Sequence, residues 1–116
     1  MISFNAANIQ KEVVDPLFLE WESLSQQIHQ AHDERNGLAH TLMEQGIALY
    51  ERLIVKTSSD SSEELIEGED YEVLPLNGKE RLSFIKARPG QYACYRQLDE
   101  LFKETKKRLA RLRLKK

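Results

Sequence analysis

The sequence predicts an all-α protein, a single-domain bundle of about four helices with one long acidic loop. Apolar residues recur at spacings of three and four over most of the chain, whereas the alternation typical of strands is almost absent. Proline and Asn-Gly signals separate the periodic stretches. A chain of 116 residues has the length of one domain, 1–116, and can bury roughly two-thirds of its unfolded surface without disulfides or metals.

The first helix is expected to begin at Asp15-Pro16. Asp15 can accept hydrogen bonds from the free amides of a first turn, and proline suits the first helical position. Val14 and Leu19 stand where a hydrophobic staple would form. Residues 1–12 show no period and are expected to be loosely ordered. The apolar face of this helix comprises Leu17, Trp21, Leu24, Ile28 and Ala31.

The second helix is predicted to run from Leu38 to Lys56, after a turn at Asn36-Gly37. Gly46 lies in its middle, where glycine costs about 1 kcal/mol relative to alanine. We explain this glycine by the close approach of another helix, with Trp21 above it. The predicted apolar face comprises Leu38, Leu42, Met43, Gly46, Leu49, Tyr50, Leu53 and Ile54.

Residues 57–75 are predicted to form the long acidic loop. Its first part, TSSDSSEELIEGED, is rich in serine and acids and cannot bury enough apolar surface to offset its ordering entropy. We expect this part to be mobile, with at most a helical turn around Glu63–Ile66. Tyr71 to Leu76 are mostly apolar and are expected to run extended across the helices.

The third helix is predicted to start at Asn77, which forms an Asn version of the capping box with Glu80. Pro89 disfavours helical geometry at Arg88 and ends this helix after about three turns. The apolar side of the third helix comprises Leu82, Phe84 and Ile85.

Pro89 is then expected to be the first residue of the fourth helix. The pairs Asp99–Lys103 and Glu104–Arg108 have the favourable acid-first i,i+4 order. The apolar face of the fourth helix comprises Tyr92, Tyr95, Leu98, Leu101, Phe102, Thr105, Leu109 and Leu112.

A further pattern runs from Leu76 to Leu101. It comprises Leu76-Asn77, Glu80-Arg81-Leu82, Phe84-Ile85, Arg88-Pro89, Tyr92, Gln97-Leu98 and Glu100-Leu101. A weaker one lies in the second helix, at Met43-Glu44 and Gly46-Ile47-Ala48-Leu49. Together these residues resemble the YpoC-like family of small uncharacterised proteins of Gram-positive bacteria. The resemblance implies a small cytoplasmic helical protein and carries over no activity, cofactor or catalytic residue.

The composition predicts a soluble, cytoplasmic protein. The single cysteine, Cys94, excludes an intramolecular disulfide and fits a reducing compartment. The N-terminus has neither a basic start nor an apolar run, so no signal peptide is expected. No apolar stretch approaches the roughly 20 residues that cross a bilayer, so no transmembrane segment is expected.

The net charge of −2 conceals a strong asymmetry along the chain. Residues 57–78 carry seven acids and no base, whereas residues 103–116 carry eight bases and one acid. The two segments could neutralise each other within one fold, which has to be weighed before an external partner is invoked.

Catalytic and metal-binding patterns are weak, and we expect no enzymatic activity and no cofactor. His29 and His32 could share a helix face beside Asp33, but the Glu-x-x-His spacing of di-iron bundles is missing. Cys94 lies among apolar helix positions, which favours a buried hydrophobe over a nucleophile. The phosphate-binding and serine-nucleophile motifs are also missing.

The sequence therefore favours a protein that acts through protein–protein contacts, with an unidentified partner and with homo-oligomerisation left open. The alternative is non-specific nucleic-acid binding through the basic C-terminal helix. The third hypothesis is an enzyme or a metal site between the helices. The alternative without a binding role is that the basic residues form a solvated helix face whose cations complement the helix dipole. The candidate partner-binding residues are Arg81, Arg88, Tyr92, Lys103, Lys107, Arg108 and Arg111.

Overall fold

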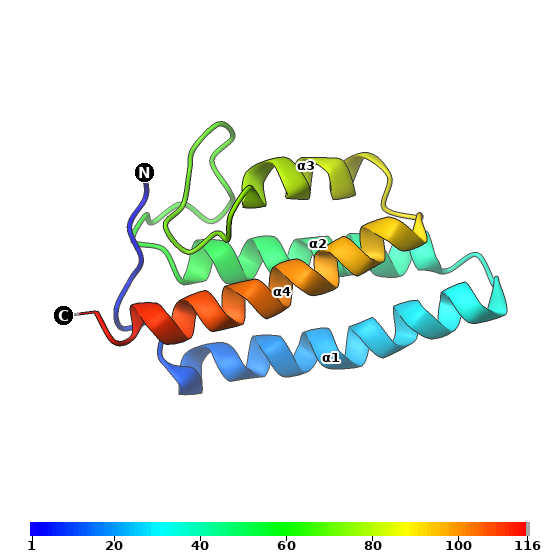
Figure 1. The fold of residues 1–116 in the computed structure, drawn as a ribbon, viewed down its shortest axis with the longest axis horizontal. Helices are drawn as coiled ribbons and strands as arrows, with labels where there is room; N and C mark the ends of the chain where they lie inside the picture. Colours follow the sequence, from blue (N-terminus) through cyan, green and yellow to red (C-terminus); the bar gives the residue numbers. More distant parts are fainter. Residues whose placement is uncertain (116) are drawn as a thin grey trace.

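A computed structural model describes residues 1–115 as four helices. Helix α1 spans Lys11–Glu34, α2 spans Ala39–Lys56, α3 spans Gly78–Ala87 and α4 spans Tyr92–Leu112. Figure 1 shows α1, α2 and α4 running along the long axis of the molecule, with the short α3 on the opposite side of α4 from α1. Helix α4 contacts each of the other three. The predicted all-α, single-domain bundle is confirmed.

The core is centred on aromatic side chains that α1, α2 and α4 contribute. The rings of Trp21 and Phe102 stack with centroids 4.4 Å apart, and the ring of Tyr50 meets Phe102 edge-on at 5.0 Å. A Cβ atom on Gly46 would lie 2.8 Å from Trp21 Cζ3 and 3.1 Å from Leu98 Cδ2. The expectation that Trp21 closely approaches Gly46 is confirmed.

Helix α1 begins one turn earlier than Asp15-Pro16. Its first residue is Lys11, and Pro16 lies inside it, so Asp15 is not its cap. The earlier start places Val14, 2% exposed, in the core behind Ile9, which is 1% exposed. Burying each of these two side chains contributes about 1.5–3 kcal/mol, and together they offset the roughly 3 kcal/mol that a proline costs inside a helix.

The expected staple between Val14 and Leu19 does not form, because Leu19 points to solvent with 63% of its surface exposed. Residues 1–12 were expected to be loosely ordered. Of these, residues 11 and 12 belong to α1, and residues 1–10 pack against the two ends of the acidic loop. Ile2 N–H donates to the Asp70 carbonyl, and Asn5 N–H donates to the Thr57 carbonyl. These bonds satisfy backbone groups that would otherwise need water.

Helix α2 agrees with its predicted range, except that Leu38 lies at the cap position and is 56% exposed. Residues 57–77 contain no helix, so the turn expected at Glu63–Ile66 is not helical. The segment after the acidic stretch forms turns instead of running extended, because its buried side chains point back into the core. These side chains are Tyr71, Val73, Leu74 and Pro75.

The capping box predicted for α3 is wrong. Asn77 adopts a left-handed backbone conformation (φ 56°, ψ 25°), and its side chain makes no capping hydrogen bond. A Cβ on the next residue, Gly78, would lie 3.2 Å from Leu74, so the chain enters α3 through a tight turn. The predicted end of α3 before Arg88 is confirmed, but Phe84 is 52% exposed instead of joining the apolar side.

Pro89 was predicted to be the first residue of the fourth helix. This prediction is wrong, because Pro89 lies before α4, which begins at Tyr92. The helix is capped by Gln91, whose carbonyl accepts from the Cys94 and Tyr95 amides. Gln91 N–H donates to the Arg88 carbonyl, which turns the chain, and a Cβ on Gly90 would lie 3.5 Å from His40 Nδ1 on α2. This turn against α2 delays the start of α4 to Tyr92.

Candidate functional site

The predicted apolar face of α4 lies against the core and fixes the direction of its charged side chains. Tyr92 is the exception on that face, with 43% of its surface exposed. The charged residues then fall on three sides: toward α3, toward α1, and outward between them. The buried residues of α4 are Cys94 and the rest of the predicted face: Tyr95, Leu98, Leu101, Phe102, Thr105, Leu109 and Leu112.

On the side toward α3, the cations are bound within the fold. Arg81 donates from two nitrogens to the carboxylate of Glu104, at 3.0 and 2.7 Å, and also donates to the Leu76 carbonyl. The side chain of Arg81 is only 22% exposed. The hydrogen bond from Arg81 lowers the pKa of Glu104. Arg81 therefore faces inward and holds α3 on α4, rather than presenting its guanidinium to a partner.

Arg108 is also engaged on this side. Its Nε donates to the Glu72 carbonyl, so the predicted Glu104–Arg108 pair is replaced by two longer-range contacts. The Glu72 carboxylate accepts from Phe4 N–H and pairs with Lys115 at 3.2 Å. Burial acts to raise the pKa of Glu72, but the hydrogen bonds from Lys115 and Phe4 lower it overall. Within residues 1–115, Glu72 is the one acid of residues 57–78 that pairs with the basic tail.

On the side toward α1, a cavity of about 320 Å³ opens between the two helices. Val14 and Phe18 form its apolar floor. The Lys106 ammonium lies 5.6 Å from the centroid of the Phe18 ring, and Arg113 donates to the Ile9 carbonyl at 2.7 Å. We call this cavity the basic groove because four cations and one acid line it. Its lining residues are Lys11, Val14, Asp15, Phe18, Lys106, Lys107, Ala110 and Arg113.

The outward side of α4 carries a row of Lys103, Lys107 and Arg111, spaced four residues apart; we call it the outer row. Lys103 pairs with Asp99 at 2.9 Å, which confirms that predicted i,i+4 pair, and this hydrogen bond raises the pKa of Lys103. Neither Lys107 nor Arg111 forms an ion pair with any other residue that the structure describes. Because Lys107 also lines the basic groove, the outer row and the groove form one continuous surface.

This helical arrangement can be set beside known proteins. Residues 11–116 match the family model described as YpoC-like protein. The chain belongs to the YpoC-like family. A 37-residue stretch is 51% identical to a Bacillus subtilis (strain 168) protein named Uncharacterized protein YpoC. The stretch covers 32% of this chain and 23% of that relative, so the chain matches about a quarter of the relative's length. No solved structure matches the chain.

In this member of the YpoC-like family, the predicted partner-binding residues do not form one surface. Arg88 and Tyr92 lie near the start of α4, and Arg111 lies 19 residues beyond Tyr92, which corresponds to about 28 Å along the helix. The Tyr92 ring contacts His32 edge-on, with centroids 5.2 Å apart. The structure therefore separates a corner at Arg88 and Tyr92 from the basic surface at the C-terminal end.

The histidines and the cysteine have local roles in the fold. His29 lies 3.4 Å from Asp33, and His40 lies 3.7 Å from Glu44, each within its own helix. Residues 1–115 contain no group of three or more potential metal-ligating side chains. Cys94 is fully buried, and this burial raises the pKa of its thiol. None of the described helices is both long and apolar enough for a membrane span.

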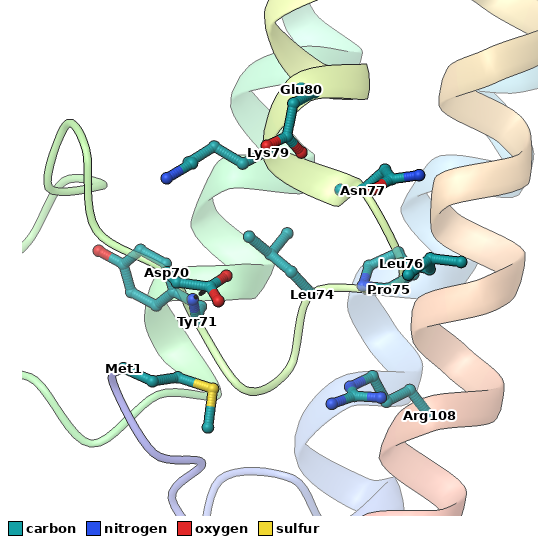
Figure 2. A pocket seen from close by; sticks show the side chains of 11 residues that line it. Met1, Asp70, Tyr71, Leu74, Pro75, Leu76, Asn77, Lys79, Glu80 and Arg108 are labelled. Carbon is teal, nitrogen blue, oxygen red and sulfur yellow. Dashed lines mark hydrogen bonds between the residues drawn. The ribbon is translucent and has the colours of Figure 1, made fainter.

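A second cavity, of about 410 Å³, lies where the acidic loop leads into α3. Figure 2 shows its charged side chains: Lys79 and Glu80 lie next to each other on α3, Asp70 lies on the loop and Arg108 on α4. Two acids and two bases cancel, so this cavity favours neither anions nor cations. Sequence reasoning missed both cavities, because each joins residues far apart in the chain.

Lys11 was missed for a different reason: it fell in the range 1–12 that showed no helical period. The available signal was the series Val14, Phe18 and Trp21, whose spacings of four and three extend the apolar face upstream of Asp15.

Proposed function

We propose that this chain is a non-enzymatic cytoplasmic protein that binds acidic segments of proteins through the outer row and the basic groove. The observation that carries the proposal is that the cations on the two sides of α4 have different surroundings. On the side toward α3, Arg81, Arg108 and Lys115 are bound to acceptors of the same chain. On the side toward α1, the cations rim an apolar floor. A rim of charge around an apolar floor suits a protein segment that brings both acids and an apolar side chain.

The cytoplasmic part of the proposal is supported by Cys94. A fully buried free thiol with a raised pKa is inert in the fold and needs no oxidising compartment. The non-enzymatic part is supported by the surroundings of the basic surface. Asp15 is the one acid among the residues lining the groove, and no histidine or cysteine accompanies it.

The proposal is tested by reversing the charge of the outer row in the variant Lys103→Glu, Lys107→Glu, Arg111→Glu. Proteins retained from nuclease-treated cell extracts by the immobilised variant are compared with those retained by the wild type. We expect acidic partners to be lost, because like charges face them at close range. The matched controls are Lys103→Arg with Lys107→Arg, which keeps the charge, and Arg88→Ala, which alters the distant corner. Retention of the same proteins in the same amounts by the reversed variant would refute the proposal.

Charge reversal is a sharper test than truncation of the basic tail. A chain ending at Leu101 would lose Phe102, Thr105, Leu109 and Leu112, all of which are buried. Its failure to bind would follow from unfolding alone.

Nucleic-acid binding is the second candidate, and the outer row favours it. Three exposed cations repeat every four residues, about 6 Å apart along the helix, and can meet successive phosphates. This candidate predicts a gel shift with duplex DNA or RNA at low salt, and an affinity that falls linearly on a log–log plot against salt. Absence of any shift at low salt would exclude it. The engagement of Arg108, Arg113 and Lys115 within the fold reduces the number of cations left for phosphates.

A further inference from the structure

The six acids of residues 60–70, which we call the acidic segment, remain uncompensated within the chain. None of them forms an ion pair with a described residue. The sequence raised the alternative that the acidic and basic stretches neutralise each other inside one fold. The structure shows that this happens only at Glu72, outside the acidic segment. The acids are Asp60, Glu63, Glu64, Glu67, Glu69 and Asp70.

The acidic segment is held in a defined shape. Ser59 N–H donates to the Ser3 carbonyl, and Ile2 N–H donates to the Asp70 carbonyl, so both ends are tied to the N-terminal residues. Leu65 packs against the core, and Ile66 N–H donates to the Tyr71 hydroxyl at 2.9 Å. A segment that is already ordered loses less conformational entropy when it docks than a free chain does.

This anchoring presents an apolar side chain among the acids. Ile66 is 37% exposed, and Glu63, Glu64 and Glu67, also exposed, lie within three residues of it. The basic groove offers the complementary arrangement, with Lys11, Lys106 and Lys107 around Val14 and Phe18. The two features match in charge and in the position of their apolar part.

The acidic segment cannot reach the basic groove of its own molecule. In Figure 1 the acidic loop rises on the α3 side of α4, whereas the groove lies between α4 and α1 on the other side. Because both ends of the segment are tied to residues 2 and 3, it cannot swing around α4. The contact can form only between molecules.

We propose that a second copy of this chain is the occupant of the basic groove, and that it inserts its acidic segment there with Ile66 over Phe18. The loop and the groove between α1 and α4 lie at the same end of the bundle, and α4 runs between them (Figure 1). A single two-fold axis that exchanged both contacts would have to pass midway between loop and groove, inside the molecule, so the two copies would overlap. The contact is therefore heterologous: the loop of one copy enters the groove of the next, and association can continue beyond the dimer as the concentration rises. This inference rests on the proposed function, because it names one acidic partner of the same surface.

The test is a charge-swap experiment by sedimentation velocity at low salt. One variant reverses the groove (Lys106→Glu, Lys107→Glu), and the other reverses the segment (Glu63→Lys, Glu64→Lys). We expect the wild type to self-associate. We expect each variant alone to self-associate about tenfold or more weakly, because the reversed side chains then meet groups of the same sign. An equimolar mixture restores association, since the unchanged acidic segment of one variant meets the unchanged groove of the other.

The control Asp33→Lys, Glu34→Lys changes the net charge as much as the segment reversal does, at the far end of α1, and is expected to self-associate like the wild type. Circular dichroism establishes that every variant is folded. Three results would overturn the inference: a wild type that stays monomeric, a mixture of the two reversed variants that stays monomeric, or a control that is lost as well.

A synthetic peptide of residues 58–70 separates this inference from the proposed function. Peptide binding by a protein that stays monomeric overturns the second copy as occupant and leaves acidic-segment binding standing. Absence of both peptide binding and self-association, with partners still retained by the outer row, also overturns the inference alone. Loss of partner retention and of both other signals overturns the two together.

Discussion

The two flanks of α4 carry similar numbers of cations but use them differently. On the α3 flank, Arg81 and Arg108 bind a carboxylate and a carbonyl of the same chain. On the α1 flank, Lys106 covers the Phe18 ring, and Lys107 has no ionic partner within residues 1–115. The difference shows that a basic helix offers for binding only those cations that neighbouring segments of the chain leave without an acceptor. Cations on the α3 flank hold the fold together. On the α1 flank, Arg113 also bonds within the fold, to the Ile9 carbonyl, whereas Lys106 and Lys107 have no ionic partner within residues 1–115.

The largest effect on stability is expected from a substitution that shifts α4 and so disturbs the contacts on both of its flanks. In Gly46→Ala, the new Cβ would lie 2.8 Å from Trp21 and 3.1 Å from Leu98, so the rings or the helix must shift. We expect a loss of about 2 kcal/mol in the free energy of unfolding, despite the better helix propensity of alanine. Urea unfolding followed by circular dichroism measures it. An alanine variant as stable as the wild type would show that the helices can separate freely.

The next effect breaks the α3 flank alone. Arg81→Ala leaves Glu104 partly buried beside α3 without its partner, and about 1–2 kcal/mol should be lost after allowing for the access of water to this half-exposed pair. The matched change on the outer row, Arg111→Ala, should stay within about 0.5 kcal/mol of the wild type. Equal losses from the two variants would contradict the distinction between the flanks.

Acid should weaken the α3 flank selectively. The pKa of Glu104 in the fold lies below its ordinary value of 4.5, because Arg81 hydrogen-bonds to the carboxylate. The contribution of Glu104 to stability is therefore complete above 4.5 and is lost as the pH falls through the lower, folded pKa. Unfolding free energies measured from neutral to acidic pH should decline less steeply for Glu104→Gln than for the wild type. The exposed Glu22→Gln serves as control, and identical slopes for Glu104→Gln and the wild type would refute the prediction.

The smallest effect on stability is expected on the α1 flank. Lys106→Glu with Lys107→Glu should change the free energy of unfolding by no more than about 0.5 kcal/mol, since both side chains are exposed. The same variant should lose acidic-segment binding. A large loss of stability would mean that these lysines also hold the fold together, and it would remove the contrast with Arg81.

Patterns within a helix could be predicted, whereas contacts between distant segments could not. The spacing of apolar residues from Tyr95 to Leu112 predicted the buried face of α4. The close approach of Trp21 to Gly46 was predicted because a glycine in mid-helix is costly unless a neighbouring helix needs the space. The ion pair between Arg81 and Glu104 joins residues 23 apart in the sequence. The local i,i+4 rule had paired Glu104 with Arg108 instead. The start of α1 was missed because the cap chemistry of Asp15-Pro16 was weighed without the burial of Val14 and Ile9.

Only the part of the candidate site that lies within one helix could be predicted from the sequence. Lys107 and Arg111 are outward on α4, as the helical periodicity indicated, but no local pattern could show that α1 supplies the floor of a groove beside them. Phe84 and Leu38 are exposed although their spacing placed them on apolar faces, because no further helix covers those positions. Periodicity states which residues share a face, and only the packing of the bundle states what that face meets.

The central claim is that acidic segments bind on the α1 flank of α4 and not on the α3 flank. The most direct measurement is a titration of the ¹⁵N-labelled protein with the unlabelled peptide of residues 58–70, followed by amide chemical shifts. The account predicts shift changes confined to the first two turns of α1 and to residues 103–113, at the C-terminal end of α4, and their loss in the Lys106→Glu, Lys107→Glu variant. Changes centred on α3 and residues 70–80, or no changes at all, would contradict it.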